Sequence, residues 1–151
     1  MKLGNYGRFA LMMATSFIIM YGVMFLNAYQ FDHVMLSTMR TYMTVLMIAP
    51  MAIFMLLYMW GMYKNKVANV AILVISILVF GTTYYMMRNQ TGISDIQYMK
   101  GMIPHHSSAI LTSERADLKN PETQLLAKEI IEAQKREIAQ MKELISRLEN
   151  E

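Results

Sequence analysis

Three long apolar stretches without a single charged residue dominate the first half of the sequence. They cover residues 9–29, 41–63 and 67–87. Each reaches the roughly 20 residues that a helix needs to cross the hydrocarbon core of a bilayer. A chain of 151 residues that is 55% hydrophobic suits one small domain plus membrane spans better than a single soluble core. The sequence therefore predicts three transmembrane helices.

The charged residues divide the chain at about residue 93. Residues 1–93 contain six basic residues and one acidic residue, whereas residues 94–151 contain eight basic and ten acidic residues. The formal charge of +3 thus comes from the flanks of the apolar stretches. The second part has no basic patch with interleaved aromatic residues, so nucleic acid is not an expected partner. We predict a membrane domain over residues 1–93 and a polar domain over residues 94–151.

Basic residues near the ends of the apolar stretches predict how the chain is oriented in the membrane. Four fall on one side and three on the other, and the richer side is expected to be cytoplasmic. The richer side has Lys2, Arg8, Lys64 and Lys66, and the other side has Arg40, Arg88 and Lys100. The amino terminus is then inside, whereas the loop over residues 31–40 and the polar domain are extracytoplasmic.

The polar domain contains two helix-start signals. Ser94 followed by Gln97 is a capping box, which predicts a helix that runs to about residue 118. Asn120 followed by Pro121 supplies an N-cap and a proline at the first helical position, which predicts a helix to about residue 148. The sequence thus indicates an all-α protein, in which three transmembrane helices precede a helical hairpin.

Two thioethers and two imidazoles lie close together in the first helix of this hairpin. Met99, Met102, His105 and His106 fall within about two helical turns. Sulfur and imidazole donors select copper, above all Cu(I), over hard cations. The chain has no cysteine, so a soft metal must be bound by methionine and histidine. If the two helices are antiparallel, Met141 faces Met99 across the hairpin.

Two polar residues interrupt the apolar seam of the second helix. In the same register, Gln134 faces His106, and Glu137 faces Met102. Burying such groups without a partner costs a few kcal/mol, and more for an ionised carboxylate. We expect Gln134 and Glu137 to hold a histidine by a hydrogen bond rather than to bind the metal directly. The apolar positions of the seam are Ile130, Met141, Leu144 and Leu148, with a second row at Ile131, Ile138 and Ile145.

A hairpin of under 60 residues has little core of its own. Two copies would complete a four-helix bundle and cover the apolar rows of the second helix. The sequence therefore predicts a homodimer.

Methionine is frequent elsewhere, with 18 in the chain, and from Met35 to Met59 it recurs at every fourth residue. A step of four advances about 40° around a helix, so this row does not stay on one face. Methionine is also an adaptable apolar filler, which favours packing over a copper ladder. At the outer end of the row, His33, Met35 and Met39 form a candidate minor soft-metal site.

Residues 95–149 resemble the bacterial family called domain of unknown function 305. The resemblance rests on the Met102–His106 core followed by the register of Gln134, Glu137 and Met141. It implies a ferritin-like helical fold and extracytoplasmic copper binding by Met99, Met102, His105, His106 and Met141. Longer members often contain two hairpins, whereas this chain has one, which strengthens the prediction of a dimer.

These patterns predict a multi-pass protein of the bacterial inner membrane whose hairpin binds copper, or another transition metal, for sequestration, resistance or handover to a partner protein. We do not expect an enzyme, because the sequence shows no triad signature, phosphate loop or His-Glu-x-x-His zinc motif. The alternative is a structural or assembly module whose polar seam sets the register of a dimer without metal. A metal-dependent oxidase or an accessory subunit of an enzyme is a third possibility.

Overall fold

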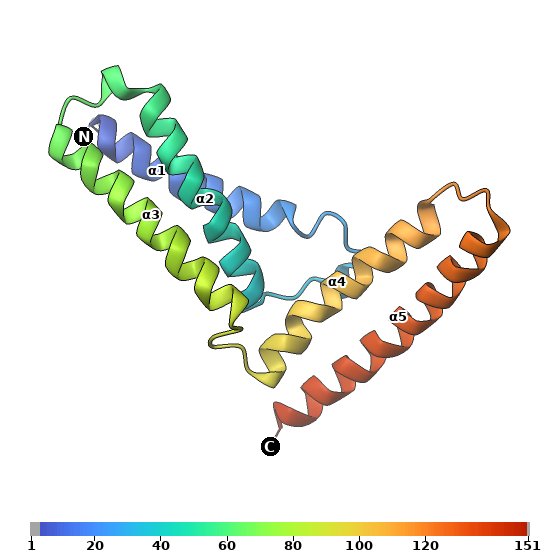
Figure 1. Cartoon of the computed structure of the whole chain (residues 1–151). Coiled ribbons are helices and arrows are strands. Elements are labelled where there is room, and N and C mark those ends of the chain that lie inside the picture. Colours follow the sequence, from blue (N-terminus) through green and yellow to red (C-terminus); the bar gives the residue numbers. More distant parts are fainter. Residues whose placement is uncertain (1–3, 151) are drawn as a thin grey trace. The chain divides into compact units, whose positions relative to one another are not determined.

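The computed structural model describes residues 4–150, and those residues form helices and connections without a β-strand. The helices are α1 (Asn5–Val23), α2 (Thr38–Tyr58), α3 (Lys66–Arg88), α4 (Asp95–Arg115) and α5 (Pro121–Leu148), with 3-10 turns at Phe31–His33 and Trp60–Met62 (Figure 1). The chain divides into two compact units. The three-helix unit contains the residues up to Val23 and the range Met39–Gly92. The hairpin unit contains the segment Met24–Thr38 and the residues from Ile93 onward.

The three-helix unit consists of α1, α2 and α3, each of which is long and apolar enough to cross a membrane. Their large apolar side chains point outward in large part, as expected for helices surrounded by lipid rather than water. The most exposed examples include Ile18, Val67, Ile77 and Leu78. The prediction of three long apolar helices is thus confirmed.

A small core holds the three helices together. Phe9, Leu56 and Tyr63 are buried in it, and the Phe9 and Tyr63 rings meet edge to face at 5.6 Å. The fully buried Asn69 is satisfied on both sides, since its Oδ1 accepts from the Tyr6 hydroxyl at 2.8 Å and its Nδ2 donates to the Tyr63 carbonyl at 2.8 Å. A buried amide with both ends paired adds specificity to an otherwise apolar contact.

The methionine row from Met35 to Met59, most of which lies in α2, has no single environment. Met55 and Met59 pack against the core of the three-helix unit, whereas Met43 and Met47 are exposed. This agrees with the packing interpretation of the row. Of the candidate minor site, His33 and Met35 belong to the hairpin unit and Met39 to the three-helix unit.

The first apolar helix is shorter than the sequence suggested. α1 ends at Val23 rather than near residue 29, and Met24–Thr38 belongs to the hairpin unit instead of to a continuous membrane domain over residues 1–93. The physical reason lies in the polar groups of this segment, since Asn27, Tyr29 and His33 find hydrogen-bond partners on α4. A hydropathy pattern contains no information about such partners.

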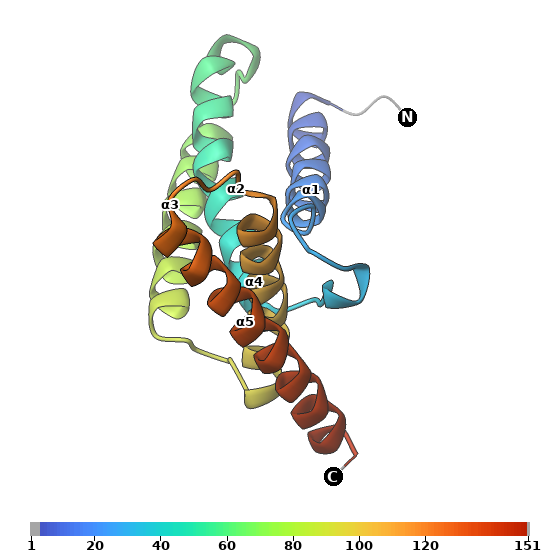
Figure 2. The ribbon, with the colours of Figure 1, turned by 90° about the vertical axis from the view of Figure 1, so that its right-hand side faces the viewer.

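In the hairpin unit, α4 and α5 lie side by side and are joined by a short connection (Figures 1 and 2). Both expected N-caps are present: the Ser94 hydroxyl accepts from the Gln97 amide at 3.3 Å, and the Asn120 side chain accepts from the Thr123 amide at 3.0 Å. α4 ends at Arg115, three residues earlier than expected. The expected helical hairpin is therefore confirmed, and α4 continues through the buried Pro104.

The core of the hairpin unit is apolar and lies between α4 and α5. It contains Met99, Ile103, Ile110, Ile138 and Ile145. Tyr29 and Met35 of the segment Met24–Thr38 pack against it from outside the hairpin. Ile138 and Ile145, which were expected to need a second copy, are only 4% and 6% exposed in a single chain. The hairpin thus obtains part of its cover from its own chain.

Candidate metal site on the hairpin

His106 occupies the middle of α4 and is fixed at both ring nitrogens. Its Nδ1 lies 3.0 Å from the carbonyl oxygen of Met102, one turn earlier in α4, and its Nε2 lies 2.7 Å from Oε2 of Glu137 on α5. The imidazole is 9% exposed as a residue, whereas the Glu137 side chain is 46% exposed. The expected hydrogen bond between a seam carboxylate and a seam histidine is therefore present.

These two contacts define the chemistry of the His106 ring. A backbone carbonyl and a carboxylate both accept hydrogen bonds, so the ring donates to both when each nitrogen carries a proton. Glu137 is thus the partner of Nε2, and the Met102 carbonyl is the partner of Nδ1. A metal ion at Nε2 would have to replace that proton and take the position of the Glu137 oxygen.

The candidate thioethers lie in a different layer of the same seam. Met99 is 6% exposed and belongs to the hairpin core, and Met141 packs against that core from α5. At a rise of 1.5 Å per residue, Met99 and His106 are about 10 Å apart along α4. Met102 lies between them and shares a helical face with His106 at i,i+4 spacing. The seam thus has a thioether layer and an imidazole–carboxylate layer.

Two predicted site residues lie apart from the His106–Glu137 pair. His105 is exposed, and its ring centroid is 6.4 Å from that of His106. Gln134 is half-buried on α5, but Glu137, one turn farther along, takes the position opposite His106 that the sequence assigned to Gln134. Over residues 4–150, histidine, aspartate and glutamate form no group of three positioned to bind a metal. That absence concerns nitrogen and oxygen ligands and does not cover the methionine thioethers.

Sequence reasoning missed Ser107, the α4 residue to which the segment Met24–Thr38 is attached. Ser107 is fully buried, and its hydroxyl oxygen accepts from the Tyr29 amide at 2.7 Å and lies 2.9 Å from Nδ1 of His33. Next to it, the Ser108 hydroxyl accepts from the Asn27 side chain at 2.8 Å. Two adjacent serines in a helix give no sequence signal for partners about 75 residues away.

Charge reinforces this attachment of the segment to the hairpin. The Lys142 ammonium donates to the Asp32 carboxylate at 2.6 Å, and this hydrogen bond lowers the pKa of Asp32 below its ordinary value of 3.8. Burial of the His33 side chain lowers its pKa below 6.5, and the nearby Lys142 charge adds to that effect. Burial thus favours the neutral form of the His33 ring.

Comparison with known proteins assigns the chain to a family. The sequence model described as "Domain of unknown function (DUF305)" matches residues 86–150. The chain is also 33% identical over 147 residues to "Uncharacterized protein L153" of Acanthamoeba polyphaga mimivirus, and the aligned part is 93% of this chain and 93% of that protein. The chain belongs to the DUF305 family. No solved structure matches it.

The two matches cover different parts of the molecule. The DUF305 match begins within the last turn of α3 and spans α4 and α5, so it contains the His106–Glu137 pair and the candidate thioethers. Met24–Thr38 lies outside the DUF305 match, whereas the similarity to the viral relative extends over nearly the whole chain. The three apolar helices are thus part of the similarity to that relative.

Proposed function

We propose that this DUF305 protein is a membrane-anchored copper-binding protein whose hairpin binds Cu(I) for sequestration, resistance or handover to a copper-handling partner. The observation that carries this proposal is the seam between α4 and α5. It contains the fixed His106 imidazole, Met102 one turn earlier on α4, and two further methionines in the hairpin core and against it. Soft sulfur and imidazole donors of this kind favour Cu(I) over hard cations.

His106 and Met102 are the residues that would hold the ion most directly. They share a face of α4, and the hydrogen bond from His106 Nδ1 to the Met102 carbonyl directs Nε2 toward α5. Glu137 is half-exposed and can turn away to water when a metal takes Nε2. Met99 and Met141 would supply sulfur from the next layer, the exposed His105 would add to the site at the surface, and Gln134 would support a histidine from α5. The bound Cu(I) would be a soft Lewis acid, and the ion itself would be handed over to the partner protein.

Competition with a Cu(I) chelator tests the site. Met102→Leu combined with Met141→Leu removes two sulfurs and keeps similar apolar volume, so the fold should be retained. We expect this double variant to bind Cu(I) at least tenfold more weakly, and His106→Ala to have a larger effect. Met43→Leu with Met47→Leu in α2 is the matched control, since these residues are exposed in the three-helix unit.

Thermal melts of each variant separate loss of ligands from loss of structure. Cu(I) affinity that is unchanged in both the methionine double variant and His106→Ala would overturn the copper proposal. The result would then favour the alternative, in which the hairpin is an assembly module. The specific observation that supports this alternative is that Glu137 and the Met102 carbonyl together engage both ring nitrogens of His106 without a metal.

We also propose that α1, α2 and α3 cross the bacterial inner membrane, with the amino terminus inside and the hairpin outside. The charge bias supports this orientation, and the hydrogen bonds between Met24–Thr38 and α4 support the number of spans. The connection between the first two spans and the domain after the third span must lie on the same side of a membrane, and here they share one compact unit.

Single cysteines test the topology in this cysteine-free chain. Lys64→Cys and Glu143→Cys both lie at exposed positions. An impermeant thiol reagent should label Glu143→Cys on intact cells and Lys64→Cys only after the membrane is permeabilised. The reverse pattern would overturn the orientation.

A homodimer is part of the proposal, with the exposed apolar side chains of α5 as its contact. Leu125 and Leu126 are 59% and 55% exposed, and Leu144 adds a third exposed leucine on the same helix. Mass measurement in mild detergent should show a dimer that Leu126→Asp dissociates. A monomeric wild-type chain would exclude this assembly.

A further inference from the structure

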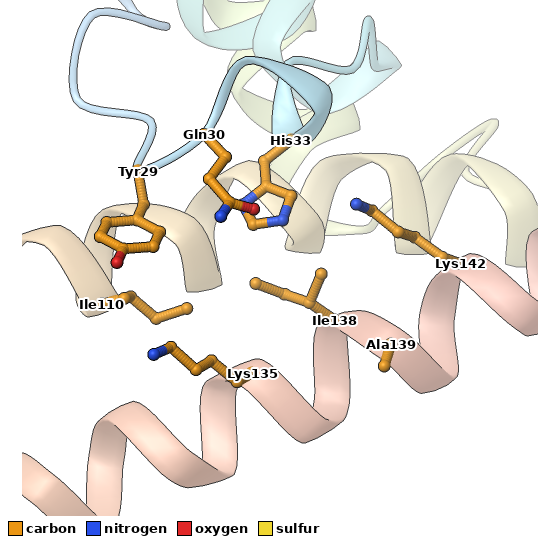
Figure 3. Close-up of a pocket in the computed structure, with 8 residues that line it drawn as sticks. All are labelled: Tyr29, Gln30, His33, Ile110, Lys135, Ile138, Ala139 and Lys142. Atoms are coloured by element: carbon orange, nitrogen blue, oxygen red, sulfur yellow. The ribbon is translucent and has the colours of Figure 1, made fainter.

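A cavity of about 270 Å3 lies in the hairpin unit between the segment Met24–Thr38 and the two helices (Figure 3). Tyr29, Gln30 and His33 line it from the segment, Ile110 lines it from α4, and side chains of α5 close the other side. Pockets for drug-sized ligands have volumes of about 300–1,000 Å3. This cavity therefore suits a smaller molecule.

The floor and the rim of the cavity differ in chemistry. Ile110 and Ile138, which belong to the hairpin core, line it together with Ala139 and provide an apolar surface. Lys135 and Lys142 of α5 place ammonium groups at its edge, as Figure 3 shows. A ligand that fits such a cavity has a short apolar body and an anionic group.

The charges around the cavity are not balanced. Asp32 neutralises Lys142 at 2.6 Å. Lys135 lies 5.8 Å from the centre of the Tyr29 ring, and the ion pairs of the described residues include no carboxylate partner for it. A cation over an aromatic face keeps its charge available to a second partner. The Glu114 carboxylate accepts the hydrogen bond of the Tyr29 hydroxyl at 3.2 Å, whereas the Lys135 ammonium lies over the ring without an ion-pair partner among the described residues.

His33 adds a polar atom to the same rim. Its Nδ1 is engaged by Ser107, and its Nε2 lies 3.8 Å from the Asp32 carboxylate, which is beyond hydrogen-bonding distance. His33 lines the cavity together with Tyr29 and Gln30 of the same segment. Only 6% of His33 is exposed, so this polar edge of the cavity is mostly buried.

We infer that this cavity binds a short-chain aliphatic carboxylate, with the carboxylate at the Lys135 ammonium and the chain on Ile110 and Ile138. The charge-assisted contact with Lys135 would orient the ligand, and contact with the isoleucines would select an aliphatic carboxylate over an inorganic anion. This site is separate from the proposed copper site, since His106, Met102 and Met141 do not line the cavity.

Calorimetric titration of the full chain in a non-ionic detergent at pH 7 tests the inference, with butyrate as the probe. Butyramide has the same shape without the charge and serves as the ligand control. We expect butyrate to bind, butyramide to bind at least fivefold more weakly, and Lys135→Gln to weaken butyrate binding at least fivefold. Lys128→Gln, an exposed lysine two turns earlier on α5 and outside the cavity, should leave butyrate affinity unchanged.

Each alternative result overturns the inference. Absence of butyrate binding to the wild-type chain, or equal binding of butyramide, would exclude a carboxylate site. Tighter binding of inorganic phosphate than of butyrate would exclude the role of the apolar floor. Equal losses in Lys135→Gln and Lys128→Gln would indicate a general charge effect of α5. Melting temperatures of both variants verify that the fold is retained.

Discussion

His33 and Ser107 lie 74 residues apart in the sequence, and their side chains meet at 2.9 Å in a buried contact. The same Ser107 oxygen accepts the Tyr29 amide at 2.7 Å. One hydroxyl on α4 therefore holds two points of the segment Met24–Thr38. Because that segment connects α1 to α2, the contact joins the first half of the chain to the family domain.

Ser107→Ala should release this segment from α4. Both the His33 nitrogen and the Tyr29 amide lose their partner, and an unsatisfied buried group costs about 1–3 kcal/mol. Hydrogen–deuterium exchange should show faster exchange at Tyr29 and its neighbours, with a lower melting temperature. Ser113→Ala, farther along α4, is the control and should leave exchange of the segment unchanged. Equal exchange in wild type and Ser107→Ala would show that Ser107 does not anchor the segment.

His33 should make the stability of the hairpin unit depend on pH. Its pKa is lowered in the folded state, mainly by burial, whereas the unfolded chain has the ordinary value of 6.5. Between the two values the unfolded state binds more protons, so stability is fully present above pH 6.5 and falls as the pH drops toward the folded pKa. Asp32 and Lys142 are the charged groups nearest to this ring.

Melting temperatures from pH 7.5 down to pH 5.5 measure this effect. His33→Gln cannot take up the proton, so its melting temperature should fall less over this range than that of the wild-type chain. Parallel curves for the two proteins would contradict the lowered pKa of His33.

The ion pair between Lys142 and Asp32 should contribute little to stability despite its 2.6 Å length. The Asp32 side chain is 64% exposed, and exposed pairs typically contribute about 0–1 kcal/mol. Asp32→Asn should therefore destabilise the hairpin unit by less than about 1 kcal/mol, and the difference should shrink in 1 M salt as charges are screened. Asp117→Asn breaks a pair of equal length whose side chains are at least 80% exposed and is the matched control. A loss in Asp32→Asn that is independent of salt would indicate a role other than charge.

Asn120 should fix where α5 begins. Its side chain accepts from the Thr123 amide at 3.0 Å, and loss of such a cap costs typically about 1 kcal/mol. Asn120→Ala should lower the free energy of unfolding by about that amount, whereas Asn120→Asp, which keeps the acceptor, should not. Chemical denaturation followed by circular dichroism measures both. Equal stability of the Ala and Asp variants would show that the cap is dispensable.

The sequence alone determined the parts of this fold that depend on local patterns. Uncharged runs of about 20 apolar residues specify helices that suit a bilayer, because length and composition suffice for that. The N-caps at Ser94 and Asn120 could be predicted from the sequence, because each side chain bonds to an amide only three residues away. The geometry of an antiparallel hairpin placed Gln134 opposite His106, which is within one turn of the observed partner, Glu137.

The tertiary structure decided what depends on contacts between distant residues. It ended α1 at Val23, because the polar groups of Met24–Thr38 bond to α4, and it covered Ile138 without a second copy. It also placed Glu137 rather than Gln134 against His106, because the exact pairing of two helices depends on how their side chains pack. Hydrogen bonds such as the one between His33 and Ser107 form only when folding brings the partners together, so no local pattern specifies them.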